Sequence, residues 1–184
     1  MKKIIVIVII IICAVLVLSY VVRNNFLIDT NKIPITSETS SFQPDPSNAT
    51  FTLDNESITL AEGKNVKSVV PGSALVEETS LMDKFAYGDI NADDKEDTAL
   101  FLARYGGGSG LFIYLAVFVS GPVTYKGSRA IFIGDRITPQ SLSIKEDVIT
   151  VKYLDRKDGE AFTTEPTVLV SKQFVFKNGE LQEK

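Results

Sequence analysis

Five carboxylates lie within ten residues of a chain that is otherwise rich in aliphatic side chains, in the stretch GDINADDKED from Gly88 to Asp97. Calcium takes about six to eight oxygen ligands, and a short loop supplies them when side-chain oxygens recur at positions 1, 3, 5 and 9 with a backbone carbonyl at position 7. With Asp89 at position 1, this spacing predicts a calcium site formed by Asp89, Asn91, Asp93, the backbone carbonyl of Lys95, and Asp97.

Two positions of the loop decide which kind of calcium loop it is. Position 6 is usually glycine because the chain turns there with positive φ, and here it is Asp94, which also tolerates that conformation. Position 12 is Leu100, where an EF-hand places a bidentate glutamate, so the stretch is not an EF-hand. The alternative without metal is a hydrated turn between two strands, in which only Lys95 offsets the repulsion among the acids.

The stretch resembles the calcium loops of FG-GAP-type repeats and dockerins, whose pattern is D-x-[DN]-x-D-G-x-x-D. The resemblance covers residues 89–97 and implies side-chain ligation by Asp89, Asn91, Asp93 and Asp97. In FG-GAP-type repeats the loop runs straight into a strand. The apolar residues from Thr98 to Leu102 fit that arrangement.

A longer resemblance covers about half of the chain. In a group of uncharacterised bacterial exported or lipid-anchored proteins, the motifs GDLNGDGxDD, GGSG and GDR follow one another, and then come a strand and DR. The corresponding residues here are Tyr87 to Asp97, Gly106 to Gly110, Gly134 to Arg136, and Ile149 to Arg156. The resemblance implies a single extracytoplasmic domain with a calcium-type loop, and it carries no function.

The glycine-rich segment Tyr105-Gly106-Gly107-Gly108-Ser109-Gly110 is the second feature that could serve a ligand. A phosphate-binding loop of the Walker type needs Gly-Lys-Ser/Thr at the start of a helix, whereas Leu111 here starts an apolar strand. We therefore expect a hairpin connection between buried strands. The alternative is a partner-facing loop that presents its backbone amides.

Catalytic groups are scarce. The chain contains no histidine, which excludes Ser-His and Cys-His relays and histidine-ligated zinc. We predict no enzymatic activity and no catalytic residue. A carboxylate pair of the kind that hydrolyses glycosidic bonds remains an alternative, although no pair stands out among the acids.

The elements around these loops have the periodicity of strands. The runs TALFLAR (Thr98 to Arg104) and LFIYLAVFV (Leu111 to Val119) are almost continuously apolar, which predicts central strands buried on both faces. Phe112, Tyr114 and Phe118 are expected in the core. The other predicted strands are 49–53, 57–60, 84–90, 130–133, 140–144, 148–154 and 167–176, with turns at 54–56, 134–135, 146–147, 158–159 and 178–179. This spacing predicts a mostly β domain, an antiparallel β-sandwich or a curved sheet.

An apolar run of 19 residues, Ile4 to Val22, precedes this domain. As a helix it would rise about 29 Å, which matches a hydrocarbon core of about 30 Å. It lacks the small-x-small site of a cleaved signal, and the residues before Cys13 do not match a lipoprotein site. Lys2 and Lys3 predict a cytoplasmic N-terminus at residues 1–3. We therefore expect a signal-anchor helix at 4–22, a flexible Ser/Thr/Pro linker at 23–47, and an extracytoplasmic β domain at 48–184.

Together these features predict a single-pass protein of the cell membrane with its C-terminal domain outside the cytoplasm. The formal net charge is −4 with both signs interspersed, so nucleic acid is not an expected partner. The predicted function is a cell-envelope binding or interaction module with one structural calcium ion, whose partner is an envelope protein or polysaccharide. The alternatives are a carboxylate-dependent envelope enzyme, for example one directed at polysaccharide, and a purely structural domain without metal.

Overall fold

A computed structural model describes residues 16, 42–72 and 74–184 of the chain. The chain divides into two compact units, Met1–Ser40 and Ser41–Lys184. Apart from Leu16, the predicted anchor at 4–22 lies outside the described residues, as do residues 1–3 and most of the linker. Within the described part of the chain, no helix has the length and apolar character needed to cross a membrane.

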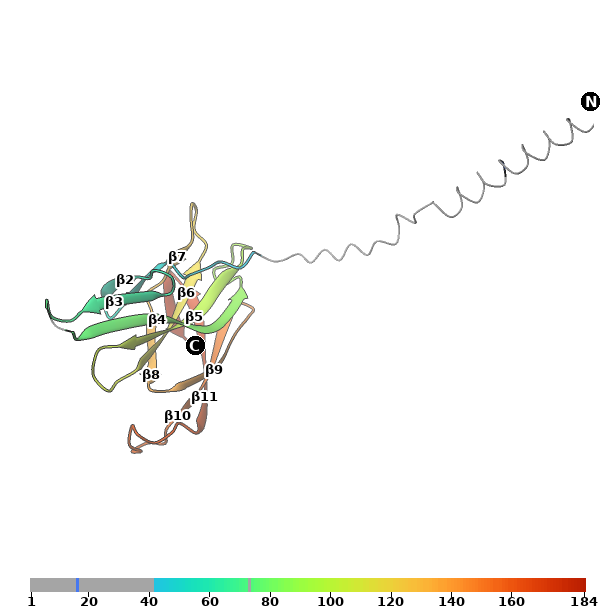
Figure 1. Ribbon diagram of the computed structural model, residues 1–184. Helices are drawn as coiled ribbons and strands as arrows, with labels where there is room; N and C mark the ends of the chain where they lie inside the picture. The colour runs from blue at the N-terminus through green and yellow to red at the C-terminus, as the bar shows by residue number, and fades with distance from the viewer. Residues whose placement is uncertain (1–15, 17–41, 73) are drawn as a thin grey trace, which may run out of the picture. The chain divides into compact units, whose positions relative to one another are not determined.

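The second unit is built from antiparallel strands, which confirms the predicted mostly β domain (Figure 1). The described residues form the strands β1 (Thr50–Leu53), β2 (Glu56–Thr59), β3 (Lys64–Ser68), β4 (Val76–Gly88), β5 (Asp97–Tyr105), β6 (Phe112–Val119), β7 (Lys126–Gly127), β8 (Ile131–Asp135), β9 (Thr138–Lys145), β10 (Val148–Asp155), β11 (Val168–Lys177) and β12 (Glu180–Glu183).

Two sheets and one hairpin make up the described part of this unit. The larger sheet has the order β3-β4-β5-β6-β7, with β8 pairing beside β7 on the same side of β6. The smaller sheet has the order β12-β11-β10-β9, and β1 and β2 form a separate hairpin. Between β8 and β9 the chain passes from the larger sheet to the smaller one at Arg136, whose φ is 52°. This sharp corner joins the sheets into one curved, sandwich-like body.

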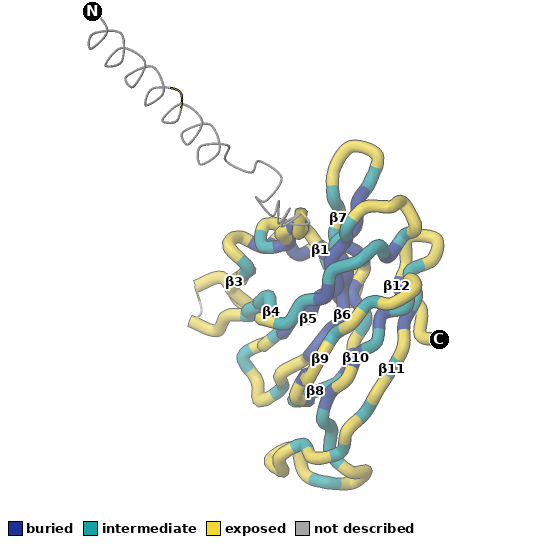
Figure 2. The backbone as a smooth tube through the Cα atoms, turned by 90° about the vertical axis from the view of Figure 1, so that its right-hand side faces the viewer, coloured by how far each residue is buried: buried dark blue, intermediate teal, exposed yellow. Residues whose placement is uncertain are grey.

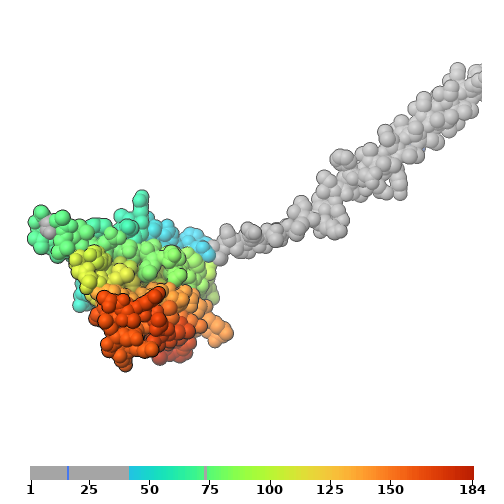
Figure 3. Space-filling model, turned by 60° about the horizontal axis from the view of Figure 1, so that its bottom comes forward, coloured from blue at the N-terminus to red at the C-terminus, as the bar shows by residue number. Residues whose placement is uncertain are grey.

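Strands β5 and β6 are covered on both faces. One face packs on the smaller sheet through Phe101, Ile113 and Leu115, which meet Ile149 and Phe174. The opposite face, which carries Leu100, Leu102, Tyr114 and Ala116, packs under the β1–β2 hairpin. Figure 2 shows the buried stretches concentrated in these central strands, and in Figure 3 the later segments, orange to red, pack closely on the middle ones. The prediction that both apolar runs are central strands is confirmed.

Three of the predicted turns form tight two-residue hairpins. Both central residues have positive φ at Asp54-Asn55, Glu146-Asp147 and Asn178-Gly179. Positive φ at both positions is the geometry of type I′ turns, whose twist matches that of the flanking strands. Asp, Asn and Gly are the residues that adopt it at least cost, which explains why these turns are readable from the sequence.

Other boundaries differ from the expectation. Strands β3, β7 and β12 and the first half of β4 were not predicted, because their residues are largely exposed or charged and do not alternate between apolar and polar. Gly134 and Asp135, expected as a turn, end strand β8 instead, and the chain turns one residue later.

The described end of the predicted linker packs on the domain. Pro44 and Pro46 are buried, and the Thr98 hydroxyl donates to the Pro44 carbonyl at 2.9 Å. The ring of Phe42 lies 6.0 Å from that of Tyr125. The chain therefore reaches the domain at the beginning of β5.

We predict that Phe101→Ala lowers the free energy of unfolding by about 3–5 kcal/mol, because it removes a fully buried ring from the contact between the sheets. The measurement is urea denaturation of the full-length protein in non-ionic detergent, followed by circular dichroism. Val123→Ala is the control, since Val123 is 96% exposed, and it should change stability by less than about 0.5 kcal/mol. A loss below about 1 kcal/mol for Phe101→Ala would contradict this packing.

Candidate functional site

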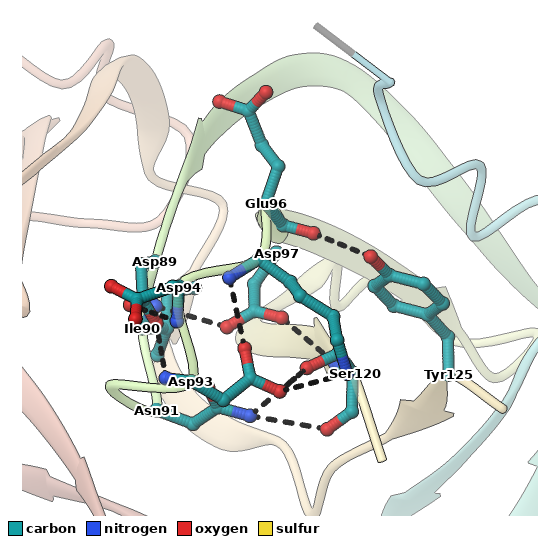
Figure 4. Close-up of polar contacts among 10 residues, drawn as sticks. Asp89, Ile90, Asn91, Asp93, Asp94, Glu96, Asp97, Ser120 and Tyr125 are labelled. Carbon is teal, nitrogen blue, oxygen red and sulfur yellow. Dashed lines mark hydrogen bonds and ion pairs between the residues drawn. The ribbon is translucent and has the colours of Figure 1, made fainter. Parts of the chain in front are cut away.

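The acidic loop, residues 89–96, connects β4 to β5 and closes one end of their ladder, where Gly88 pairs with Asp97 (Figure 4). A side chain at Gly88 would crowd β9, because a Cβ there would lie 3.0 Å from the Ile144 side chain. The predicted ligands Asp89, Asn91 and Asp93 lie in the turn that connects β4 to β5.

Asp97 is a structural carboxylate at the base of the loop. It is fully buried, and its two oxygens accept the backbone N–H groups of Ile90, at 2.9 Å, and Ser120, at 2.8 Å. These bonds join the start of the loop to the end of β6. Burial raises the pKa of Asp97; the two N–H groups oppose this shift, and the carboxylates of Asp93 and Asp89 add to it.

Asp89 organises the turn itself. One of its oxygens accepts the backbone N–H of Asp93 at 3.2 Å, and the other accepts that of Asp94 at 2.9 Å. The chain has positive φ at two residues of the turn, Ala92 and Asp94, both at 62°. These are the two positions at which the motif GDLNGDGxDD has glycine. Residues with a Cβ adopt this left-handed conformation at a cost that glycine does not incur.

Asn91 and Asp93 both contact Ser120. The Asn91 amide donates to the carbonyl and the hydroxyl of Ser120, at 3.1 and 3.3 Å, and the Ser120 hydroxyl donates to Asp93. This last bond, followed by the bonds and charge of Lys95, lowers the pKa of Asp93. The Lys95 ammonium lies 3.5 Å from the Asp93 carboxylate.

A calcium ion fits this loop in some respects and not in others. The backbone turns at position 6 as a calcium loop requires, and the side-chain oxygen of Asn91 is buried with no hydrogen-bond partner among the described residues. However, Asp93 is engaged by Ser120, and Asp97 by two backbone N–H groups. In the described part of the chain, no three His, Cys, Asp or Glu side chains are grouped so that they could hold a metal ion. A calcium ion would compete with Ser120 for Asp93.

The glycine-rich loop, Tyr105 to Gly110, lies at the opposite end of the β4–β5 ladder. Arg136 holds it: its guanidinium donates to the Ser109 carbonyl and, at 3.0 Å, to the Ser109 hydroxyl. Arg156 in turn donates to the Arg136 carbonyl at 3.0 Å. The motifs GGGSG, GDR and DR, which are far apart in the sequence, therefore meet at one end of the domain.

A pocket of about 480 Å³, which the sequence did not predict, lies beside this glycine-rich loop. It forms on the face of the larger sheet at the turn of the β1–β2 hairpin, where the hairpin cover ends. We call it the Arg104 pocket, and its lining consists of three acids, one arginine and three aromatic residues: Asp54, Glu56, Glu77, Arg104, Phe112, Tyr114 and Phe132.

Arg104 is the centre of the pocket, and its side chain is only 13% exposed. Its guanidinium donates to Glu56 at 2.9 Å and to Glu77 at 2.5 Å, and lies 3.5 Å from the Asp54 carboxylate. The Tyr114 hydroxyl also donates to Asp54, at 2.6 Å. Burial, followed by the neighbouring Asp54, raises the pKa of Tyr114.

Two phenylalanines form the apolar wall of the pocket. Phe132 is 51% exposed and Phe112 is 37% exposed, and their ring centroids are 6.2 Å apart. Phe112 was expected in the core together with Tyr114 and Phe118; Tyr114 is buried and Phe118 packs against the core, whereas Phe112 lines the pocket. The only signal in the sequence was Arg104 itself, a charge on the core-facing side of an apolar strand.

No protein-family model, curated protein or solved structure matches this chain.

We predict that Ala92→Gly raises the free energy of unfolding by about 1 kcal/mol, because a left-handed backbone costs about that much for a residue with a Cβ. Urea denaturation of the full-length protein measures the change. Ala161→Gly is the matched control: Ala161 is exposed and does not have positive φ, so the same substitution should lower stability by about 0.4–1 kcal/mol. Equal effects of the two variants would contradict a strained backbone at Ala92.

Proposed function

We propose that the β domain is a non-catalytic binding module of the cell envelope, tethered to the membrane by the segment 4–22 and stiffened by one calcium ion in the acidic loop. Its partner is an envelope protein or polysaccharide. The observation that carries the binding role is the Arg104 pocket, because exposed aromatic rings beside polar groups in a concave site are typical of ligand binding.

The calcium part of the proposal rests on the backbone of the loop. Asp89 already accepts the N–H groups at positions 5 and 6, and the buried side-chain oxygen of Asn91 has no partner in the part of the chain that the structure describes. A cation at the loop would take this oxygen together with carboxylate oxygens of Asp89 and Asp93. It would offset the repulsion between these acids and Asp97, whose pKa their charges raise in addition to the larger effect of burial.

The alternative of a carboxylate-dependent enzyme has one observation in its favour, since Glu56 and Glu77 lie in the same pocket. Both are bound to the same Arg104 guanidinium, however. The hydrogen bond from Lys67, followed by that from Arg104, lowers the pKa of Glu56. A general acid for glycoside hydrolysis needs a raised pKa instead. We therefore favour binding over catalysis.

We predict that calcium at about 10 mM raises the melting temperature of the full-length protein by about 5–10 °C over a chelator control. This corresponds to a dissociation constant of about 10⁻⁴–10⁻³ M, as in extracellular modules, which stabilises by about 1.4–2.7 kcal/mol. Asp93→Ala should abolish the difference between the two conditions.

The control for this measurement is Asp158→Ala, which removes an exposed aspartate from another loop and should leave the calcium response intact. Identical melting temperatures of the unsubstituted protein in calcium and in chelator would reject the metal site. The acidic loop would then be a metal-free turn held by Asp89, Asp97 and Ser120, which is the alternative that the sequence left open.

The tether is tested with a single engineered thiol. Cys13 is the only cysteine, and it lies within the segment proposed to span the membrane. We predict that Thr163→Cys, at an exposed position, reacts with a membrane-impermeant maleimide in intact cells, because the domain lies outside the cytoplasm. The unsubstituted protein should stay unlabelled. Labelling of Thr163→Cys only after lysis would contradict this orientation.

A further inference from the structure

We infer that the Arg104 pocket binds a cationic group, an ammonium or guanidinium carried on an alkyl chain such as a basic side chain of a partner. This inference rests on the proposed binding function and assigns the chemical class of its ligand. Three properties of the pocket carry it: its excess of carboxylates, the acceptor oxygens that remain available, and the exposed rings beside them.

The charge of the lining excludes an anionic ligand. Three carboxylates face one guanidinium, and the second cation nearby, Lys67, is bound to Glu56 and leaves the local charge negative. Arg104 is surrounded by carboxylates, so it is not available to an anion. An incoming cation meets an attractive field, which the low-dielectric walls of a concave site strengthen.

The hydrogen-bonding capacity that remains is acceptor capacity. Within the described chain, one oxygen of Asp54 and one of Glu77 accept no hydrogen bond. Arg104 contacts the other oxygen of each residue, and Tyr114 donates to the same oxygen of Asp54. An ammonium supplies three donors and a guanidinium five, and neither competes as an acceptor.

The rings supply the complementary apolar surface. Phe132 lies against both Phe112 and Tyr114, with centroid distances of 6.2 and 5.6 Å, and it is the most exposed of the three. A cation over an aromatic face gains about 0.5–1 kcal/mol at exposed sites and more when it is desolvated. The alkyl stem of a basic side chain would cover the remaining ring surface, as such stems do on apolar surfaces.

The glycine-rich loop shapes one rim of this pocket. A Cβ at Gly110 would lie 2.7 Å from the Phe112 ring, so a side chain there would force the ring to move from its present position across the loop. A Cβ at Gly106 would lie 3.8 Å from the second oxygen of Glu77. This loop, for which the sequence left a partner-facing role as the alternative to a plain hairpin connection, therefore borders both the aromatic wall and the acidic wall of the pocket.

The test is a ligand-observed NMR titration of the full-length protein in non-ionic detergent, with calcium held constant. The probe is Nα-acetyl-L-lysine methylamide, whose only charge is the side-chain ammonium. We expect binding in the millimolar range that weakens as salt is raised. Acetylation of the side-chain amine should weaken binding at least about tenfold, because it removes the charge.

Two pairs of variants locate the site. Phe132→Ala should weaken binding roughly fivefold, whereas Phe162→Ala, at an exposed ring outside the pocket, should not. Asp54→Asn should weaken it roughly two- to fivefold, whereas Asp147→Asn, at a turn residue that also has positive φ, should not. Because Asn tolerates that backbone, the Asp54 variant is expected to fold.

Other outcomes separate this inference from the proposed function. Equal binding of the lysine probe and its acetylated form would overturn the cation assignment, as would loss of binding in the two control variants. Binding of the neutral disaccharide chitobiose in place of the lysine probe would also overturn it, while the binding module itself would stand. If neither probe binds, the inference fails, and the calcium and orientation measurements still decide the rest of the proposal independently.

Discussion

The end of the domain that carries the acidic loop depends on one constraint, the buried carboxylate of Asp97. A charged group with no solvent contact is costly unless hydrogen bonds compensate it, and here two backbone N–H groups from separate segments do so. These bonds determine where β4 stops, where β5 starts, and where β6 ends. The position of Ser120 follows from them, and Ser120 in turn holds Asn91 and Asp93. The acidic loop is therefore ordered by the hydrogen bonds of Asp97, a residue that solvent does not reach.

The same sheet produces the pocket at its other end for a different reason. Strands β5 and β6 are long, and one of their faces is covered by a hairpin whose strands have only four residues each. Beyond the turn of this hairpin, the same face of β5 and β6 is in contact with water. Arg104 stands where the strand leaves the apolar cover, and the carboxylates of the hairpin turn and of β4 neutralise it. Because the β1–β2 hairpin is shorter than the strands it covers, the polar Arg104 pocket, bordered by aromatic rings, forms beyond its turn.

Whether a structural feature can be predicted from the sequence depends on whether residues close together in the chain determine it. The central strands were predictable because both of their faces are buried, and the hairpins because Asp, Asn and Gly mark positive φ. Strand β3 was not, since its residues KNVKS lie at a sheet edge with little burial. The order of oxygen ligands in the acidic loop is local, whereas the competition from Ser120 comes from 27 to 29 residues away. The lining of the Arg104 pocket comes from one turn and five strands, so no spacing in the sequence predicts it. Phe112 shows the limit most clearly: its place in an alternating pattern indicated a core residue, and only the end of the hairpin cover left it exposed.

The path by which the chain reaches the domain has a mechanical consequence. Phe42 contacts Tyr125, the Tyr125 hydroxyl donates to the Glu96 carbonyl, and Pro44 is bonded to Thr98. A pulling force applied through the preceding segment would therefore load the start of β5, an interior strand paired on both sides, and not peel away an edge strand. The load would pass beside the acidic loop, so an ion bound there would reinforce the point of attachment. The Arg104 pocket, at the far end of the same strand, would be shielded from that tension.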